Sequence, residues 1–199
     1  INIISDQKIL VICGPGNNGG DGILITKLLL DKQKDVKLYA PLEIAKTKDS
    51  KKALNLLSSD TSIIKSVNFK NYDIVIDCIF GVGLNRPITG KLKNFFQDLN
   101  ISKLTVISID MPSGVYTDTG QIDSVAIKAD ITLTFHRLKP GQLLLPGKEY
   151  TGKIELLDID LVNLDNETRI FINTPPPIKK VNNSDHKYSK GTSHIIAGT

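Results

Sequence analysis

The chain has 199 residues, of which 40% are hydrophobic and 23% are charged, and its formal net charge at pH 7 is +4. This balance is typical of a globular protein that buries a core, and it excludes a chain that is wholly disordered, collagen-like or coiled-coil. No apolar run approaches the roughly 20 residues of a membrane-spanning helix. The lysines are not clustered as they are on a nucleic-acid-binding face. We therefore expect neither a membrane nor a nucleic acid as a partner.

Along the chain, short runs rich in valine and isoleucine alternate with amphipathic stretches. In order, this pattern predicts a strand at 8–13, a helix at 21–32, a strand at 36–40, a helix at 48–58, a strand at 72–77, a helix at 90–99, and strands at 104–110, 130–135 and 154–159. Strands that alternate with helices are typical of the α/β class. We expect a three-layer, Rossmann-like sandwich, with a mostly parallel sheet and helices on both faces.

A proline-rich break divides the chain near residue 172. Asn173 and Thr174 are followed by three consecutive prolines, which cannot donate backbone hydrogen bonds and favour an extended linker. We expect a first domain at 1–172, a linker at 173–185 and the truncated start of another domain at 186–199.

The two cysteines, Cys13 and Cys78, both lie in apolar segments. Two cysteines do not make a disulfide framework, and no basic-then-apolar leader opens the chain. We therefore expect a reducing compartment and a cytoplasmic protein. Neither cysteine has a histidine or an acid at a fixed spacing, so both are interpreted as core residues at strand ends.

Ligands of an open parallel sheet bind outside the carboxyl ends of its strands. The loop after the first strand has the G-x-G-x-x-G spacing of a dinucleotide site at Gly14, Gly16 and Gly19. An ordinary dehydrogenase would also carry an acid after its second strand, and the sequence there is Tyr39-Ala40-Pro41. The alternative is a glycine-rich turn in which Asp21 caps a helix.

Acids end two further predicted strands. Asp77 follows an apolar run, and a buried carboxylate must be paired, protonated or bound to a cation. Asp110 ends another apolar strand, and we expect the two to lie close together with separated pKa values, so that one acts as an acid or base. The alternative for each acid is a helix or turn cap. In the second loop, Arg86 is a candidate for binding phosphate.

The loop after the strand at 130–135 contains His136 and Lys139. His136 is a candidate general base, although a single histidine is more often structural or simply exposed. Lys139 is a candidate for binding phosphate.

Four motifs occur together in one order: CGPGNNGGDG, DCIFGVGLNRP, IDMPSGVYTDTG and TFHRLKPG. From about residue 8 to 160 the chain resembles the YjeF N-terminal domain, the NAD(P)HX epimerases. The final HKYSKGTSHIIAGT resembles the start of the ADP-dependent NAD(P)HX dehydratase domain. The resemblance implies metabolite repair: interconversion of the R and S hydrates of NADH and NADPH, so that a dehydratase can restore NAD(P)H.

The resemblance also implies site residues, a potassium ion and a homo-oligomer, either a dimer or a larger assembly with the dehydratase domain. Potassium would be held by Asn18, Asp77 and Ser113, whose oxygen atoms suit a hard cation. Asp110 is our candidate for the proton-transfer group. The residues that would contact the substrate are Asn17, Asn18, Gly19, Gly20, Asp21, Gly81, Val82, Gly83, Leu84, Asn85, Arg86, Pro87 and Asp110.

Two other functions remain open at this point. The same fold could serve as a non-catalytic module that binds a nucleotide or a protein, although a scaffold would not need Asp77, Asp110 and Ser113. An ordinary nucleotide-dependent oxidoreductase is disfavoured by the missing acid after the second predicted strand.

Overall fold

The computed structural model describes residues 7–57, 63–162, 170 and 172–173. The chain divides into two compact units, Ile1–Leu161 and Val162–Thr199. The first unit holds every helix and strand reported below. Apart from Asn173, the expected linker and second domain lie outside the described residues. In the part of the chain that the structure describes, no helix combines the length and apolar character needed to cross a membrane.

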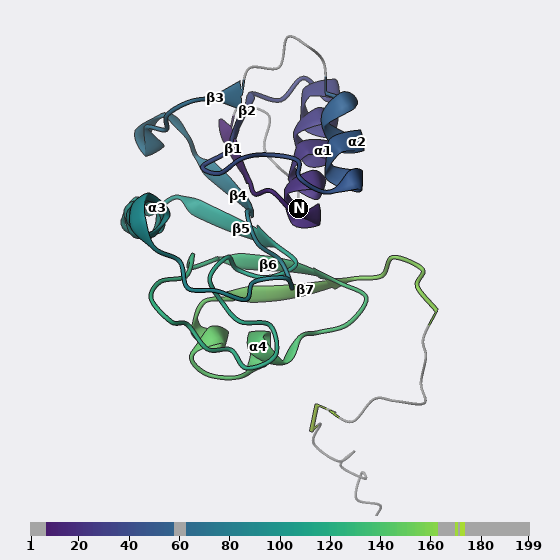
Figure 1. The fold of residues 1–199 in the computed structure, drawn as a ribbon, viewed down its shortest axis with the longest axis vertical. Coiled ribbons are helices and arrows are strands. Elements are labelled where there is room, and N and C mark those ends of the chain that lie inside the picture. Colours follow the sequence, from purple (N-terminus) through teal and green to yellow (C-terminus); the bar gives the residue numbers. More distant parts are fainter. Residues whose placement is uncertain (1–6, 58–62, 163–169, 171, 174–199) are drawn as a thin grey trace, which may run out of the picture. The chain divides into compact units, whose positions relative to one another are not determined.

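The first unit is built on a seven-stranded sheet in which every pair of neighbouring strands is parallel (Figure 1). The strand order is β3-β2-β1-β4-β5-β6-β7, so the chain moves outward in one direction from β1 and in the other direction from β4. The gap between β1 and β4 is therefore the topological switch point, where ligands of doubly wound sheets bind. The strands are β1 (Ile9–Cys13), β2 (Val36–Tyr39), β3 (Ile63–Ile64), β4 (Ile74–Cys78), β5 (Thr105–Ile109), β6 (Ile131–Phe135) and β7 (Lys153–Leu157).

Helices cover both faces of the sheet, as the sequence predicts (Figure 1). Helices α1 (Asn17–Asp31) and α2 (Lys48–Asn55) pack on one face, and α3 (Gly90–Ile101) packs on the other. All five side chains of β1 are buried, because successive residues of a strand point to opposite faces and both faces are covered. The shorter elements are η1 (Phe69–Asn71), α4 (Pro140–Leu143) and η2 (Gly147–Glu149).

Helix α1 begins at Asn17, four residues before the start predicted from the apolar spacing. Its first turn contains Gly19 and Gly20, which are poor helix formers on propensity alone. Packing explains the difference. A Cβ on Gly19 would lie 1.9 Å from the Gly14 carbonyl oxygen, and one on Gly20 would lie 3.1 Å from the Cα of Ser50. The glycines therefore let α1 approach the first loop and α2 more closely than any other residue would.

Candidate functional site

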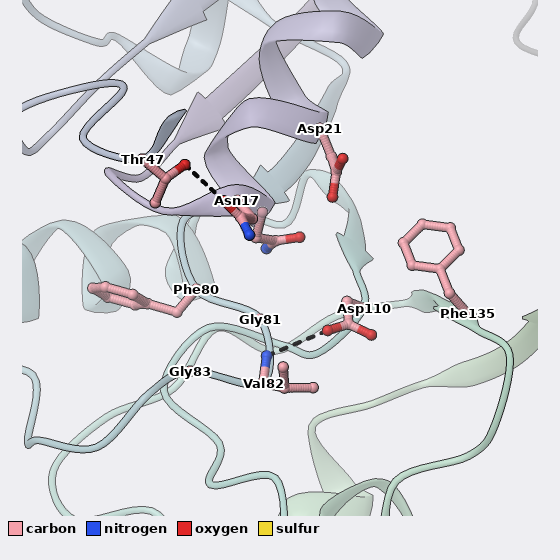
Figure 2. A pocket seen from close by; sticks show the side chains of 10 residues that line it. Asn17, Asp21, Thr47, Phe80, Gly81, Val82, Gly83, Asp110 and Phe135 are labelled. Carbon is pink, nitrogen blue, oxygen red and sulfur yellow. Dashed lines mark hydrogen bonds between the residues drawn. The ribbon is translucent and has the colours of Figure 1, made fainter. Parts of the chain in front are cut away.

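A cavity of about 370 Å³ opens at the switch point (Figure 2). Its walls come from the start of α1, the loop after β2, the loop after β4 and the ends of β5 and β6. The volume lies within the range of small-molecule sites. The residues that line it are Asn17, Asn18, Asp21, Thr47, Phe80, Gly81, Val82, Gly83, Asp110 and Phe135.

The glycines of the first loop have three different roles. A Cβ on Gly14 would lie 1.9 Å from the carbonyl oxygen of Ile79, so this residue makes the tight turn against the segment that follows β4. Gly19 gives the close approach of α1 described above. No atom lies within 4 Å of a Cβ built on Gly16, so the backbone there stays open to a ligand. These are the roles that the glycines of dinucleotide-binding turns play, at the positive end of a helix dipole.

Asn17 and Asn18 have contrasting environments. The Thr47 hydroxyl donates a 2.6 Å hydrogen bond to Asn17 Oδ1, which ties α1 to the residue that caps α2. The amide oxygen and nitrogen of Asn18 are both shielded from solvent, and neither has a hydrogen-bond partner. Because a buried polar group without a partner is costly, the Asn18 amide indicates that a ligand belongs beside it.

Asp110 follows β5 in a left-handed backbone conformation, with φ = 68°. The backbone N–H of Val82 donates to its Oδ2 at 3.3 Å, and the Lys139 ammonium lies 2.6 Å from its Oδ1. Asp110 and Lys139 are only 15% and 16% exposed, so water screens this pair less than it screens a surface ion pair. The carboxylate is therefore held from two sides at the cavity wall.

Asp21 projects toward the cavity from the wall opposite Asp110, and Phe135 lies beside them (Figure 2). Burial raises the pKa of Asp21, and the negative charge of Asp110 raises it further. Asp21 does not cap α1, because the cap position is Gly16 and makes no side-chain hydrogen bond. The alternative interpretation of Asp21 as a helix cap is therefore wrong.

Asp77 is fully buried and is not one of the residues that line the cavity. Its Oδ1 accepts from the Ser113 hydroxyl at 2.6 Å and from the Ile79 N–H at 3.2 Å. Its Oδ2 accepts from the Ser108 hydroxyl and the Ser113 N–H, both at 2.9 Å. Desolvation raises the pKa of Asp77, and these four donors oppose the rise. The two carboxylates that face the cavity are thus Asp21 and Asp110, and not the pair of strand-end acids that the sequence predicts.

The other predicted site residues fall into two groups. Gly81, Val82 and Gly83 line the cavity, and a Cβ on Gly81 would lie 2.9 Å from Asp110 Oδ2. The remaining predicted residues lie outside the lining: Gly19 and Gly20 are buried in the first turn of α1, Leu84 packs in the core on the α3 face, and Asn85, Arg86 and Pro87 are exposed.

Neither candidate of the fourth loop lines the cavity. His136 follows β6, and its backbone N–H donates to the Leu157 carbonyl oxygen at 2.9 Å. The Lys139 ammonium pairs with the Asp110 carboxylate at 2.6 Å.

Sequence reasoning missed Thr47, Phe80 and Phe135. Thr47 lies in the loop after β2 and caps α2, and its spacing of three residues from Ser50 is a capping signal that the sequence contains. The two phenylalanines resembled ordinary core residues, and no sequence pattern distinguishes an aromatic cavity wall from an aromatic core.

The fold and the cavity define a doubly wound α/β domain with its ligand site at the switch point. Residues 2–141 match the model of the family described as YjeF-related protein N-terminus. The chain belongs to this family.

Two curated relatives support the assignment to this family. The chain is 34% identical over 203 residues to the bifunctional NAD(P)H-hydrate repair enzyme Nnr of Thermofilum pendens, and the match covers 95% of this chain and 39% of that protein. It is also 34% identical over 158 residues to the NAD(P)H-hydrate epimerase of Oenococcus oeni, covering 78% of this chain and 75% of the relative. The chain thus spans about two fifths of the length of the T. pendens relative.

The crystal structure of yeast YNL200c superposes with a TM-score of 0.63 at 21% identity. That match covers 79% of this chain and 68% of the yeast chain, and it supports the fold.

Proposed function

We propose that this domain is an NAD(P)H-hydrate epimerase, which interconverts the R and S hydrates of NADH and NADPH in metabolite repair. The observation that carries the proposal is the cavity at the switch point, where a glycine loop opens α1 and the carboxylates of Asp21 and Asp110 face each other from opposite walls. The relative from O. oeni has this activity in its name. We expect the phosphates near the first glycine loop and the nicotinamide-derived ring near Asp110.

The reaction inverts C6 of the hydrated ring, which carries a hydroxyl group next to the ring nitrogen. A carboxylic acid donates its proton to the hydroxyl, the C6–O bond breaks, and water leaves. The nitrogen lone pair then forms a planar iminium. Water adds to the opposite face, and its proton passes to a carboxylate. Asp110 is our proton-transfer residue, and the raised pKa of Asp21 makes it a suitable partner on the opposite wall.

Potassium is the metal that we propose for the site. Asn18 offers a hard cation an amide oxygen that is buried without a partner, and the fully buried Asp77 carboxylate beside Ser113 offers negative charge, with four protein donors on its two oxygen atoms for the ion to displace. Asn18, Asp77 and Ser113 would hold the ion. A bound cation would supply positive charge that stabilises the buried carboxylate and orders the loops.

We further propose a cytoplasmic location and a homo-oligomer. Both cysteines are free and buried, which fits a reducing compartment. The strand at the end of the sheet, β7, and the residues after it expose apolar side chains that an interface would cover: Leu156, Leu157, Ile159 and Leu161. Light scattering on the purified chain would measure the assembly. For the complete protein we propose an additional dehydratase domain, because the T. pendens relative is bifunctional.

The direct test mixes the purified protein with the R hydrate and a separate S-specific dehydratase. We expect the R form to disappear faster than it does without the protein. Asp110→Asn should slow the reaction by at least about 100-fold, the usual contribution of a positioned acid or base. Asp118→Asn is the matched control, because Asp118 is exposed and lies outside the cavity lining. An unchanged rate with the wild-type protein would refute the epimerase proposal and favour a binding module.

A further inference from the structure

Lys139 is fully engaged inside the protein. Its ammonium donates to the Thr134 hydroxyl at 2.7 Å and to the Phe135 carbonyl oxygen at 3.0 Å, and it lies 2.6 Å from Asp110 Oδ1. An ammonium has three hydrogens, and these three acceptors use all of them. Lys139 therefore has no donor left for a substrate phosphate, the role that the sequence suggests for it.

Gln142 connects the same two residues through their main chains. It is fully buried, and its Nε2 donates to the carbonyl oxygen of Asp110 at 2.8 Å. Its Oε1 accepts from the backbone N–H of Lys139 at 2.9 Å. A single carboxamide thus fixes the distance between the backbone that carries the carboxylate and the backbone that carries the ammonium.

Asp110 needs such support because of its backbone. A non-glycine residue in the left-handed region is strained, and it persists where the surroundings determine its conformation. The backbone N–H of Asp110 donates to the Leu133 carbonyl oxygen at 2.7 Å, and its own carbonyl oxygen accepts from Gln142 Nε2. Its carboxylate pairs with the Lys139 ammonium and accepts from the Val82 N–H. Both contacts from the 139–142 segment come from residues that do not line the cavity.

We propose that Lys139 and Gln142 form a positioning clamp for Asp110, with Lys139 gripping the carboxylate and Gln142 gripping the main chain. The clamp pairs Oδ1 with the ammonium while Oδ2 accepts the Val82 N–H, so the carboxylate is held in one orientation at the cavity wall. This inference rests on the proposed function, because it assigns the clamp to the acid–base residue of that reaction.

The test measures kcat and KM separately in the coupled epimerase assay. Lys139→Met should lower kcat about 10- to 100-fold, the scale of a misplaced catalytic group, with KM nearly unchanged. Lys139→Arg should recover part of the loss, because a guanidinium can still pair with the carboxylate. Gln142→Met, which keeps the side-chain volume but removes both hydrogen bonds, should also lower kcat more than it changes KM.

Lys27→Met is the matched control. Lys27 also pairs with an aspartate, Asp31, but on the exposed surface of α1, and its loss should leave both constants unchanged. The dissociation constant for NADPH should also stay within about twofold in Lys139→Met.

Several results would overturn the clamp. A rise in KM at constant kcat would make Lys139 a substrate ligand, and unchanged constants would make it irrelevant to the reaction. If Lys139→Met does not fold, as judged by circular dichroism, Lys139→Arg and Gln142→Met decide, and full kcat in Gln142→Met refutes the clamp. A wild-type protein with no epimerase activity would refute the proposed function instead, which keeps the two failures distinct.

Discussion

Replacing Asp77 with asparagine keeps the shape of this buried side chain and removes one of its two acceptor atoms. If Nδ2 takes the place of Oδ2, the Ser108 hydroxyl can rotate to accept, but the Ser113 N–H faces another donor. If Nδ2 takes the place of Oδ1, the Ser113 hydroxyl can rotate, but the Ile79 N–H loses its acceptor. Either orientation leaves one buried backbone N–H unpaired.

The loss in the free energy of unfolding follows from this one unpaired N–H. One unsatisfied buried donor costs about 1–3 kcal/mol, so we expect Asp77→Asn to lower the free energy of unfolding by about 2 kcal/mol. For a domain of this size the melting temperature should fall by roughly 4–8 °C. Asp77→Ala removes both acceptor atoms from four donors and should cost more, about 3–5 kcal/mol.

The assay is urea unfolding at pH 7 without potassium, so that a bound cation contributes nothing. The midpoint should fall while the slope stays constant, which identifies a change in stability. Asp73→Asn is the matched control: Asp73 is exposed and accepts one hydrogen bond, from the N–H of Lys8 at 2.8 Å, which an amide oxygen can also accept. If Asp77→Asn is as stable as the wild type, removal of the buried charge offsets the lost hydrogen bond, and the reasoning is wrong.

Three further predictions concern the cavity. Gly16→Ala should leave the melting temperature unchanged, because no atom lies within 4 Å of its Cβ, and should weaken NADPH binding at the first loop. Gly19→Ala should destabilise the fold by at least about 1 kcal/mol, because its Cβ would collide with a carbonyl oxygen. Equal effects of the two changes on stability would contradict this reasoning. Potassium at ten times its dissociation constant should stabilise the protein by about 1.4 kcal/mol relative to choline chloride at equal ionic strength, and Asn18→Ala should abolish the difference in a thermal-shift assay. Asp110→Asn should lower the pKa of Asp21, measured from its carboxyl ¹³C shift, because it removes one of the two causes that raise this pKa. The raised pKa also means that the charge of Asp21 opposes folding above that pKa. Asp21→Asn should therefore stabilise the protein by up to about 1 kcal/mol at pH 7 and not at pH 3.

The sheet was largely predictable from the sequence, because parallel strands buried on both faces are continuous runs of valine, isoleucine and leucine. The runs that contain Ile9–Cys13 and Thr105–Ile109 show this clearly. The two-residue strand Ile63–Ile64 and the single-turn helix Pro140–Leu143 were not predicted, because elements this short have no periodicity to detect. The early start of α1 depends on close contacts between distant segments, which propensity does not represent.

The position of the site in the fold could be predicted from the sequence, but the contacts between its side chains could not. The rule that ligands bind at the carboxyl ends of strands identified three walls of the cavity, including Asn18 and Asp110. The rule could not tell which acid faces the cavity, because that depends on side-chain direction. The Asp77 carboxylate accepts hydrogen bonds from Ser108 and Ser113, and Asp21 is the acid that faces the cavity opposite Asp110. The assignments of residues to substrate and potassium stay predictions.

The left-handed backbone of Asp110 also bears on how this family could diverge. Aspartate and asparagine tolerate this conformation better than most residues, and β-branched side chains tolerate it worst. A single change from aspartate to asparagine would therefore remove the charge and leave the turn undisturbed. A protein that acquired this change would keep the folded cavity and lose the charged carboxylate. Such a cavity could then evolve to bind a ligand without acting on it.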